Sequence, residues 1–182
     1  DSMSRFANRD LADLVQTQIV GDLRTLWDPA WNRRQLRNAD YSEAVRPNVP
    51  AVLLELLSHQ NFLDMQFMLD PRFRFDAARA IYKAILRFVA TQHGTPYVVQ
   101  PLPPDHCSAE FSGARSATLR WRPQEDPLEP GAKPDRYVVY VRRGENGFDN
   151  GTVCNDTVWT TRELRPGEVT SFAVAALNAG GE

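Results

Sequence analysis

The sequence changes its pattern of apolar residues near Thr91, and this change limits the fold more than any other feature. Before it, apolar residues recur at three- and four-residue steps, which is typical of amphipathic helices. After it come short runs rich in β-branched and aromatic residues: "SATLRWRP", "DRYVVYVRRG", "TVWTT" and "TSFAVAALN". Turns rich in Pro, Gly, Asn and Asp separate them, and this spacing favours a small antiparallel β-sandwich. Between the two parts, "HGTPYVVQPLPPDH" (His93 to His106) holds four prolines in fourteen residues and is typical of an extended linker. We therefore predict one domain over residues 1–92, a linker over 93–104 and a second domain over 105–182.

Two helices are predicted in the first part. One runs from Ser4, which can cap a helix, to about Trp27, and Pro29 then prevents its continuation. The other runs from about Phe75 to Val89. Their apolar stripes consist of Leu11, Leu14, Val15, Ile19, Leu23 and Leu26 in the first helix, and of Ala78, Ile81, Tyr82, Ile85, Leu86 and Val89 in the second. Because each stripe occupies one helix face, we expect both helices to cover a sheet.

One carboxylate, Glu55, interrupts the apolar run from Ala51 to Leu57. Burying an unpaired carboxylate is costly, so such a residue points to solvent, is paired, or lies at a site that needs a charge. As a helix that starts at Pro50, the run would place Glu55 near the edge of the apolar face. As a strand, the run would be apolar on both faces, which suits the central strand of a parallel sheet covered by helices. Periodicity does not distinguish the two.

The composition indicates a soluble globular protein of one or two domains. Hydrophobic residues make up 42% of the 182 residues, and the formal net charge is -2, which gives no electrostatic case for binding nucleic acid or a membrane surface. No apolar stretch approaches the roughly 18 residues that a membrane helix needs. The chain begins without an initiator Met and stops within a strand-and-turn pattern, so we expect it to be a piece of a longer protein.

The cysteines and histidines do not have the spacing of a metal or redox motif. Cys107 and Cys154 would allow one disulfide, but two buried free thiols are the simpler expectation. His59, His93 and His106 show no HxxxH or HxxE spacing, so structural or solvent-facing roles are favoured over metal ligation.

Two further stretches have ordinary explanations. "FLDMQFMLD" (Phe62 to Asp70) is predicted to be the packed entry to the second helix rather than a binding surface. Arg33, Arg34 and Arg37 form a basic cluster that could meet an anionic ligand, although salt bridges on a solvated helix face are the favoured interpretation.

The second half resembles a fibronectin type III module. Trp121 in "LRW" matches the core tryptophan of the second strand, and Tyr137 and Val139 fit one face of the third. "LRPGEVTSFAVAALNAGGE" (Leu164 to Glu182) is similar to the segment around the sixth strand, which ends in an Asn-x-Gly-Gly turn. Thr170 replaces the tyrosine expected at the corner before that strand, so the usual hydroxyl-to-backbone bond is absent or replaced. The seventh strand is missing, which predicts an exposed sheet edge.

The first half resembles the C-terminal portion of zinc-dependent N-acetylmuramoyl-L-alanine amidases, which cut the amide bond between muramic acid and the stem peptide of peptidoglycan. "SRFANRDLADLVQTQIV" (Ser4 to Val20) is similar to the family's "SR-x-LA" helix. "RRQLRNADYSEAVR" (Arg33 to Arg46) resembles its "RG-x-K-x-A-x-F" segment, with Gln35 in place of glycine. "VPAVLLEL" followed by Asn61 resembles "PAVLVELGFISN", and "DPRFRFDAARAIYKAI" resembles its closing helix.

The amidase resemblance implies a role for Glu55 and a cofactor that the chain does not hold. The matching glutamate lies at the end of a sheet strand, faces the zinc site and acts on the attacking water, which makes Glu55 the catalytic residue. A solvated helix edge is the simpler alternative for Glu55. The family's zinc ligands, two histidines and a glutamate, precede the matched segment, so the resemblance implies Zn2+ in the parent protein and none bound by this chain alone.

These observations predict a fragment of a bacterial cell-wall hydrolase that is secreted, periplasmic or on the cell surface. Its fold would be a partial three-layer α/β amidase-like domain followed by an all-β fibronectin type III sandwich. We expect the chain alone to be inactive and its apolar surface to be covered, for example by the missing N-terminal part of the same domain. The predicted partner is peptidoglycan or another cell-surface glycan, without nucleic acid or a membrane span. Two alternatives remain: a non-catalytic glycan-binding scaffold, which Gln35 and the altered "LLSHQN" loop favour, or a fragment of another secreted carbohydrate-active enzyme.

Overall fold

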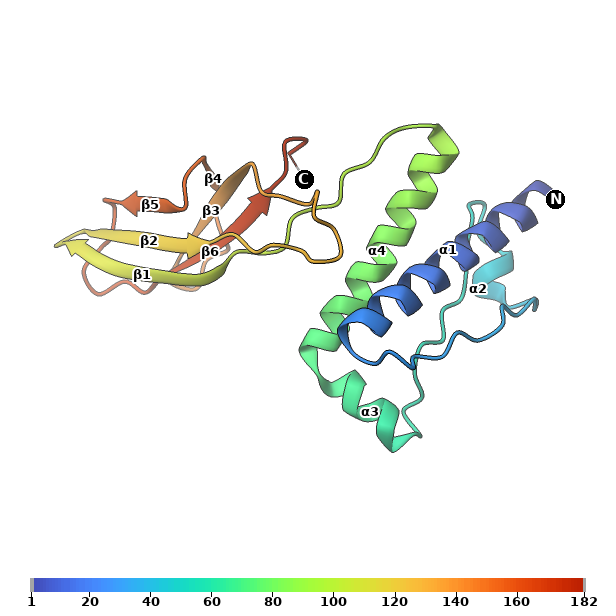
Figure 1. The fold of residues 1–182 in the computed structure, drawn as a ribbon. Coiled ribbons are helices and arrows are strands. Elements are labelled where there is room, and N and C mark those ends of the chain that lie inside the picture. The colour runs from blue at the N-terminus through green and yellow to red at the C-terminus, as the bar shows by residue number, and fades with distance from the viewer. Residues whose placement is uncertain (1, 182) are drawn as a thin grey trace. The chain divides into compact units, whose positions relative to one another are not determined.

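The chain forms two compact units, Asp1–Tyr97 and Val98–Glu182, in a computed structural model that describes residues 2–181 (Figure 1). The predicted linker, residues 93–104, spans the division between them. Within residues 2–181, no helix combines the length and the apolar character that crossing a membrane requires.

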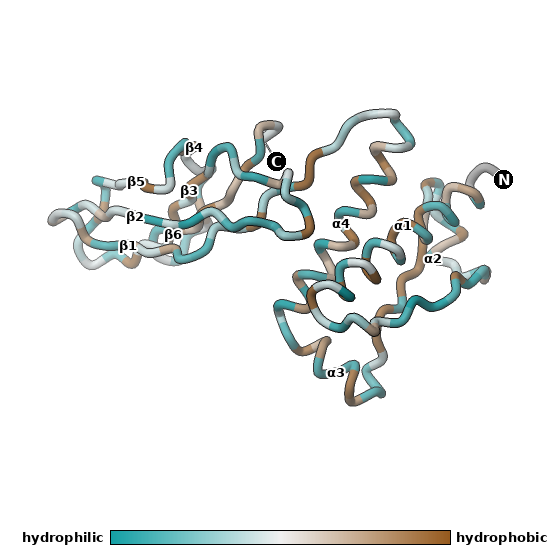
Figure 2. Tube along the Cα trace, in the orientation of Figure 1, coloured by the Kyte–Doolittle hydropathy of each residue, from teal (hydrophilic) through white to brown (hydrophobic). Residues whose placement is uncertain are grey.

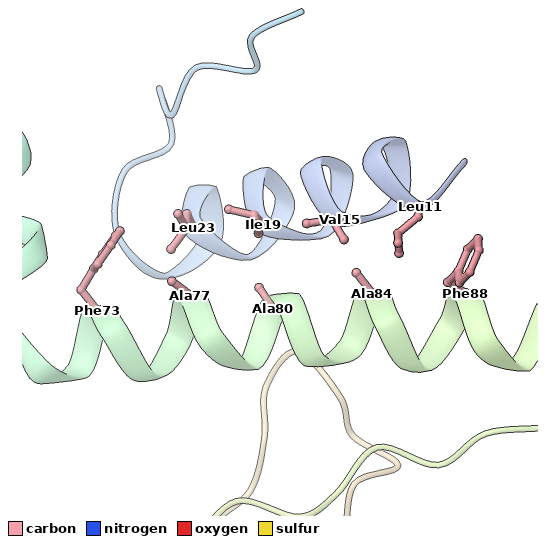
Figure 3. Packing of buried hydrophobic residues seen from close by; sticks show 9 residues of the cluster. All are labelled: Leu11, Val15, Ile19, Leu23, Phe73, Ala77, Ala80, Ala84 and Phe88. Atoms are coloured by element: carbon pink, nitrogen blue, oxygen red, sulfur yellow. The ribbon is translucent and has the colours of Figure 1, made fainter. Parts of the chain in front are cut away.

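The first unit is built on two long helices, α1 (Ser2–Leu26) and α4 (Pro71–His93). Their buried faces meet along most of their length, as Figure 3 shows. The residues at this interface are Leu11, Val15, Ile19 and Leu23 from α1, and Phe73, Ala77, Ala80, Ala84 and Phe88 from α4. On α4 the central positions are alanines, which lets large α1 side chains fill the space between the helices. Both predicted helices are confirmed, but Ser4 is not a cap, because α1 already begins at Ser2.

Local signals fix both ends of α4. The Asp70 side chain accepts a hydrogen bond from the backbone N–H of Arg72 at 2.8 Å, and Pro71 occupies the first turn, where its missing N–H costs nothing. The Arg72 side chain also donates to Asp70, and these hydrogen bonds lower the pKa of the Asp70 carboxyl. Gly94 ends the helix in the left-handed conformation, with φ of +61°. The helix therefore begins at Pro71 rather than at Phe75, where the apolar stripe placed its start.

Two short helices connect α1 to α4. These are α2 (Ser42–Val45) and α3 (Phe62–Leu69), and the Asn61 side chain caps α3 by accepting from the N–H of Leu63 at 3.0 Å. One residue of α3, Phe67, joins an aromatic cluster at one end of the helix pair. The cluster consists of Trp27, Trp31, Phe67 and Phe73. The predicted packing of this stretch against the entry to α4 is thus correct for Phe67, whereas Phe62 and Leu69 are exposed.

The expected sheet of the first domain is not present among residues 2–97. The stretch from Ala51 to Leu57, predicted to be either a helix or a strand, is neither: it is extended chain without a paired neighbour. A strand requires a second strand for its backbone hydrogen bonds, and the described part of this unit supplies only helices and loops. The three-layer α/β arrangement is therefore wrong for this unit as it stands.

The second unit contains six antiparallel strands in two sheets. They are β1 (Asp105–Gly113), β2 (Ser116–Arg122), β3 (Arg136–Arg143), β4 (Thr152–Cys154), β5 (Val158–Thr161) and β6 (Thr170–Leu177). One sheet has the order β1-β2-β5 and the other β4-β3-β6. The sequence predicts β2, β3, β5 and β6. It misses β1, which is almost wholly exposed, and β4, which has only three residues.

Residues of both sheets share one apolar cluster in this unit. Trp121 of β2 is 4% exposed, and its ring meets that of Tyr137 of β3 edge-on, with the centroids 5.4 Å apart. Val139 is fully buried beside them. The prediction that Trp121, Tyr137 and Val139 form the core is confirmed.

Replacing Gly151 with alanine is expected to destabilise the second unit by about 1–3 kcal/mol, because Gly151 has φ of +77°, a conformation that costs an L-residue energy. An added Cβ would also collide with Val138 and lie 2.8 Å from Cε1 of Tyr140. Hydrogen exchange of β3, followed by mass spectrometry, measures the effect. Gly147→Ala is the matched control, since a Cβ at Gly147 would meet nothing within 4 Å. Equal exchange in the two variants would contradict the prediction.

Candidate functional site

Glu55 lies in the extended segment between α2 and α3. Side chains of α1 and α3 hold the segment near its two ends. At one end, the N–H of Ala51 donates to Oδ1 of Asn8 on α1 at 3.0 Å, and Nδ2 of Asn8 reaches the carbonyl of Ala44 at 3.4 Å. At the other end, the N–H of Ser58 donates to Oδ2 of Asp64 on α3 at 2.9 Å. The position of Glu55 is therefore set by α1 and α3.

The segment has a covered side and an uncovered side. Val52, Leu56 and Leu57 are half-buried and pack against the cluster between α1 and α4. Leu53 and Leu54 are 46% and 39% exposed. Figure 2 shows the hydrophobic colour of this stretch between α2 and α3. Large apolar side chains are thus left in water beside a carboxylate.

Glu55 itself is exposed and makes no hydrogen bond or ion pair with any residue that the structure describes. Of the three possibilities for a charged residue in this apolar run, the structure shows exposure to solvent. The carboxylate therefore carries no burial cost. The expected location at the end of a sheet strand is wrong for this chain, since the segment has no paired neighbour. The alternative location on a helix edge is also wrong.

The three histidines lie on different elements. His59 is exposed in the turn that follows the segment, and His93 is the last residue of α4. His106 lies in β1 with φ of +48°, and its Nδ1 lies 2.9 Å from a carboxylate oxygen of Asp105. Among residues 2–181, no three His, Cys, Asp or Glu side chains gather as a metal site would require. The residues present therefore do not fit the zinc ion that the amidase resemblance implies.

The basic cluster after α1 is partly used within the unit. Arg33 lies 2.5 Å from the Asp13 carboxylate and donates to the Thr17 hydroxyl at 2.6 Å, both on α1. The carbonyl of Arg34 accepts from the side chain of Gln16 at 2.7 Å. The favoured interpretation, a salt bridge on a helix face, is confirmed for Arg33, while Arg34 and Arg37 remain exposed.

The structure also contains a buried ion pair that the sequence analysis missed. Nζ of Lys83 on α4 lies 2.8 Å from Oδ2 of Asp22 on α1, and the two side chains are 1% and 9% exposed. Gln18 donates to the other carboxylate oxygen of Asp22 at 2.8 Å. The two residues lie on helices far apart in the sequence, so no local pattern signals that they meet. The pair links α1 to α4, and removal of either partner would leave the other charge buried and unpaired.

The two cysteines are free thiols. Their expected burial is wrong for Cys107, which is exposed in β1, while Cys154 in β4 is half-buried. Partial burial, and then the Asp105 carboxylate, raise the pKa of the Cys107 thiol. A raised pKa leaves less thiolate at neutral pH, which disfavours a nucleophilic role.

Comparison with known proteins gives matches among solved structures alone: no protein family and no curated protein matches the chain. The twitchin kinase region of C. elegans, which contains a fibronectin domain, matches with 24% identity and a TM-score of 0.40 over 45% of this chain and 14% of that one. Titin kinase with its flanking domains matches with 23% identity and a TM-score of 0.38 over 45% of this chain and 15% of that one. The FN5 domain of Drosophila Lar matches with 21% identity and a TM-score of 0.33 over 44% of this chain and 83% of its own. All three TM-scores lie below 0.5.

Proposed function

We propose that this chain is part of a bacterial cell-wall hydrolase that cleaves the N-acetylmuramoyl-L-alanine amide bond of peptidoglycan. The four motifs between Ser4 and Ile85 support this assignment through their order along the chain. The observation that carries it is the exposure of Glu55, an ion with no partner in the described structure, on an apolar segment fixed at both ends. A carboxylate that accepts a proton from water must be accessible to water, and the exposed Glu55 meets this requirement.

In this proposal Glu55 moves a proton. The carboxylate accepts a proton from a water molecule as the water oxygen bonds to the amide carbonyl carbon. The protonated side chain then donates that proton to the amide nitrogen as the C–N bond breaks. The products are the lactyl carboxylate of muramic acid and the free amine of the stem peptide. The zinc ion implied by the family would polarise the carbonyl, but residues outside this chain would have to hold it.

The second unit would be a fibronectin type III module in the same secreted or surface-attached protein. The two three-stranded antiparallel sheets and the shared cluster around Trp121 support this assignment. The chain's sixth strand, β6, ends at Leu177, where an N–H of Gly181 donates to the carbonyl of Asn178 in a turn. Such a module would act as a spacer that positions the hydrolase on its substrate.

The polypeptide that includes the residues encoded upstream of Asp1 provides the test. Loaded with zinc, it is expected to release stem peptides from purified peptidoglycan, and a chelator is expected to stop the release. The 182-residue chain is the control and should release none. Failure of the longer polypeptide to cut, although zinc is bound, would contradict the amidase assignment. Binding of that polypeptide to intact peptidoglycan would then favour the scaffold alternative.

A further inference from the structure

Two Asn-Gly steps lie in the loop between β3 and β4, at Asn146–Gly147 and Asn150–Gly151. In such a step the backbone nitrogen of the glycine can attack the side-chain amide of the asparagine, because the glycine has no Cβ to hinder the approach. Asparagine is a thermolabile residue for this kind of reason. An acidic residue precedes each asparagine, Glu145 in one step and Asp149 in the other, so the two steps have nearly the same local chemistry.

The fold holds the second of these steps. The N–H of Gly151 donates to Oδ1 of Asp149 at 3.0 Å, and the same oxygen accepts from the N–H of Val141 on β3 at 3.0 Å. The N–H of Asp149 in turn donates to the carbonyl of Val141 at 3.0 Å. Gly151 therefore cannot turn its nitrogen toward the Asn150 side chain without losing a hydrogen bond that ties the loop to β3.

The first step is not held in this way. Gly147 is exposed, and its N–H makes no hydrogen bond to any residue that the structure describes. A Cβ added at Gly147 would meet nothing within 4 Å, so the space around it is open. Asn146 is also exposed, and only its backbone is engaged, through an N–H that donates to the carbonyl of Arg143 at 3.2 Å. Both reacting groups of this step are thus free to meet in the presence of water.

We propose that Asn146 is a site of non-enzymatic deamidation, and that the hydrogen bond between Gly151 and Asp149 protects Asn150 from the same reaction. The inference concerns the second unit and does not rest on the proposed function. It adds a covalent modification site to the loop between β3 and β4.

The reaction consumes one water molecule and releases one ammonia. The backbone nitrogen of Gly147 bonds to Cγ of Asn146 as the C–N bond of the side-chain amide breaks, and the proton of the Gly147 N–H leaves with the amide nitrogen as ammonia. Water then opens the resulting succinimide ring at one of its two carbonyl carbons, which restores the Gly147 N–H. Opening at Cγ gives aspartate, and opening at the main-chain carbonyl gives isoaspartate.

Either product carries a carboxylate where the amide stood. The formal net charge of the chain therefore changes from -2 to -3, because one neutral side chain becomes an anion. Isoaspartate also runs the main chain through the former side chain, which adds one methylene group to the loop. Ion-exchange chromatography should separate the modified chain from the original one.

Incubation of the 182-residue chain in mildly alkaline buffer tests the proposal. Trypsin cuts after Arg143 and Arg162, so both steps lie in one peptide, and fragment-ion mass spectrometry assigns each deamidation to its asparagine. Asn146 is expected to deamidate at least about fivefold faster than Asn150, because Gly151 must first lose its hydrogen bond. In denaturing urea the two rates should become similar. Equal rates in the folded chain, or the same ratio in urea as in buffer, would overturn the proposal.

Three variants separate the hydrogen bond from local charge. Asp149→Ala removes the acceptor of the Gly151 N–H and should raise the rate at Asn150 at least about fivefold. Glu145→Ala is its matched control, since it removes the acidic residue before Asn146, where no such bond exists, and should leave the rate there nearly unchanged. Gly147→Ala should slow Asn146 by about tenfold, because the new Cβ hinders the attack. An equal rise in the two acidic variants, or an unchanged rate at Asn146 in Gly147→Ala, would contradict the mechanism.

Discussion

Glu55→Gln is expected to slow stem-peptide release from peptidoglycan by about 100-fold or more in the polypeptide that carries the upstream residues. Glutamine has nearly the shape of glutamate but accepts no proton from water at neutral pH, so it cannot act as the base or return a proton to the leaving amine. The loss should appear in kcat more than in KM, because the proton transfer occurs in the transition state rather than in substrate binding.

Glu55→Gln should change the proton transfer without changing the fold. Glu55 is exposed and contacts no described residue through a hydrogen bond or ion pair, so the substitution should leave the helical circular dichroism and the Tm unchanged. Glu43→Gln on α2 is a matched control, since it neutralises another exposed carboxylate of the same unit. An unchanged release rate in Glu55→Gln would remove Glu55 from the mechanism, and an equal loss in both variants would point to net charge.

The sequence predicts those parts of the fold that local chemistry determines. The apolar stripes locate α1 and α4, and alternation with β-branched and aromatic residues locates β2, β3, β5 and β6. The start of α4 at Pro71 was also encoded locally, in the Asp70 cap and the proline after it, although the stripe alone placed it later. By contrast, β1 is exposed along nearly its whole length and forms because β2 pairs with it.

The surroundings of the candidate site could not be predicted from the sequence. Glu55 is identified from its unusual position in an apolar run, but its environment depends on residues elsewhere in the sequence, such as Asn8 on α1, which binds the backbone of Ala51. Whether Ala51–Leu57 forms a strand is decided by what lies beside it, and composition does not encode that. The Asp22–Lys83 pair is similar, because only the packing of α1 on α4 brings the two charges together.

Phe73→Ala is expected to destabilise the first unit by about 3–5 kcal/mol, the range for a phenylalanine lost from a packed core. Phe73 is 2% exposed and its ring lies at the centre of the aromatic cluster. The ring centroids of Trp27, Phe67 and Trp31 are 5.3, 5.2 and 5.6 Å away. Truncation therefore leaves a cavity where α1, α3 and the loop after α1 meet α4, and the neighbouring rings cannot all move in to fill it.

Phe75→Ala provides the matched control, since Phe75 lies two positions along the same helix and is 43% exposed. Its loss removes little buried surface, so its cost should be below about 1 kcal/mol. Urea unfolding followed at 222 nm measures both variants, because the helices belong to the first unit alone and the signal reports that unit. Since α1 and α3 hold the two ends of the segment around Glu55, Phe73→Ala should also speed hydrogen exchange at Ala51 and Ser58. A loss of stability no greater than that of Phe75→Ala would show that the aromatic cluster is not the centre of this core.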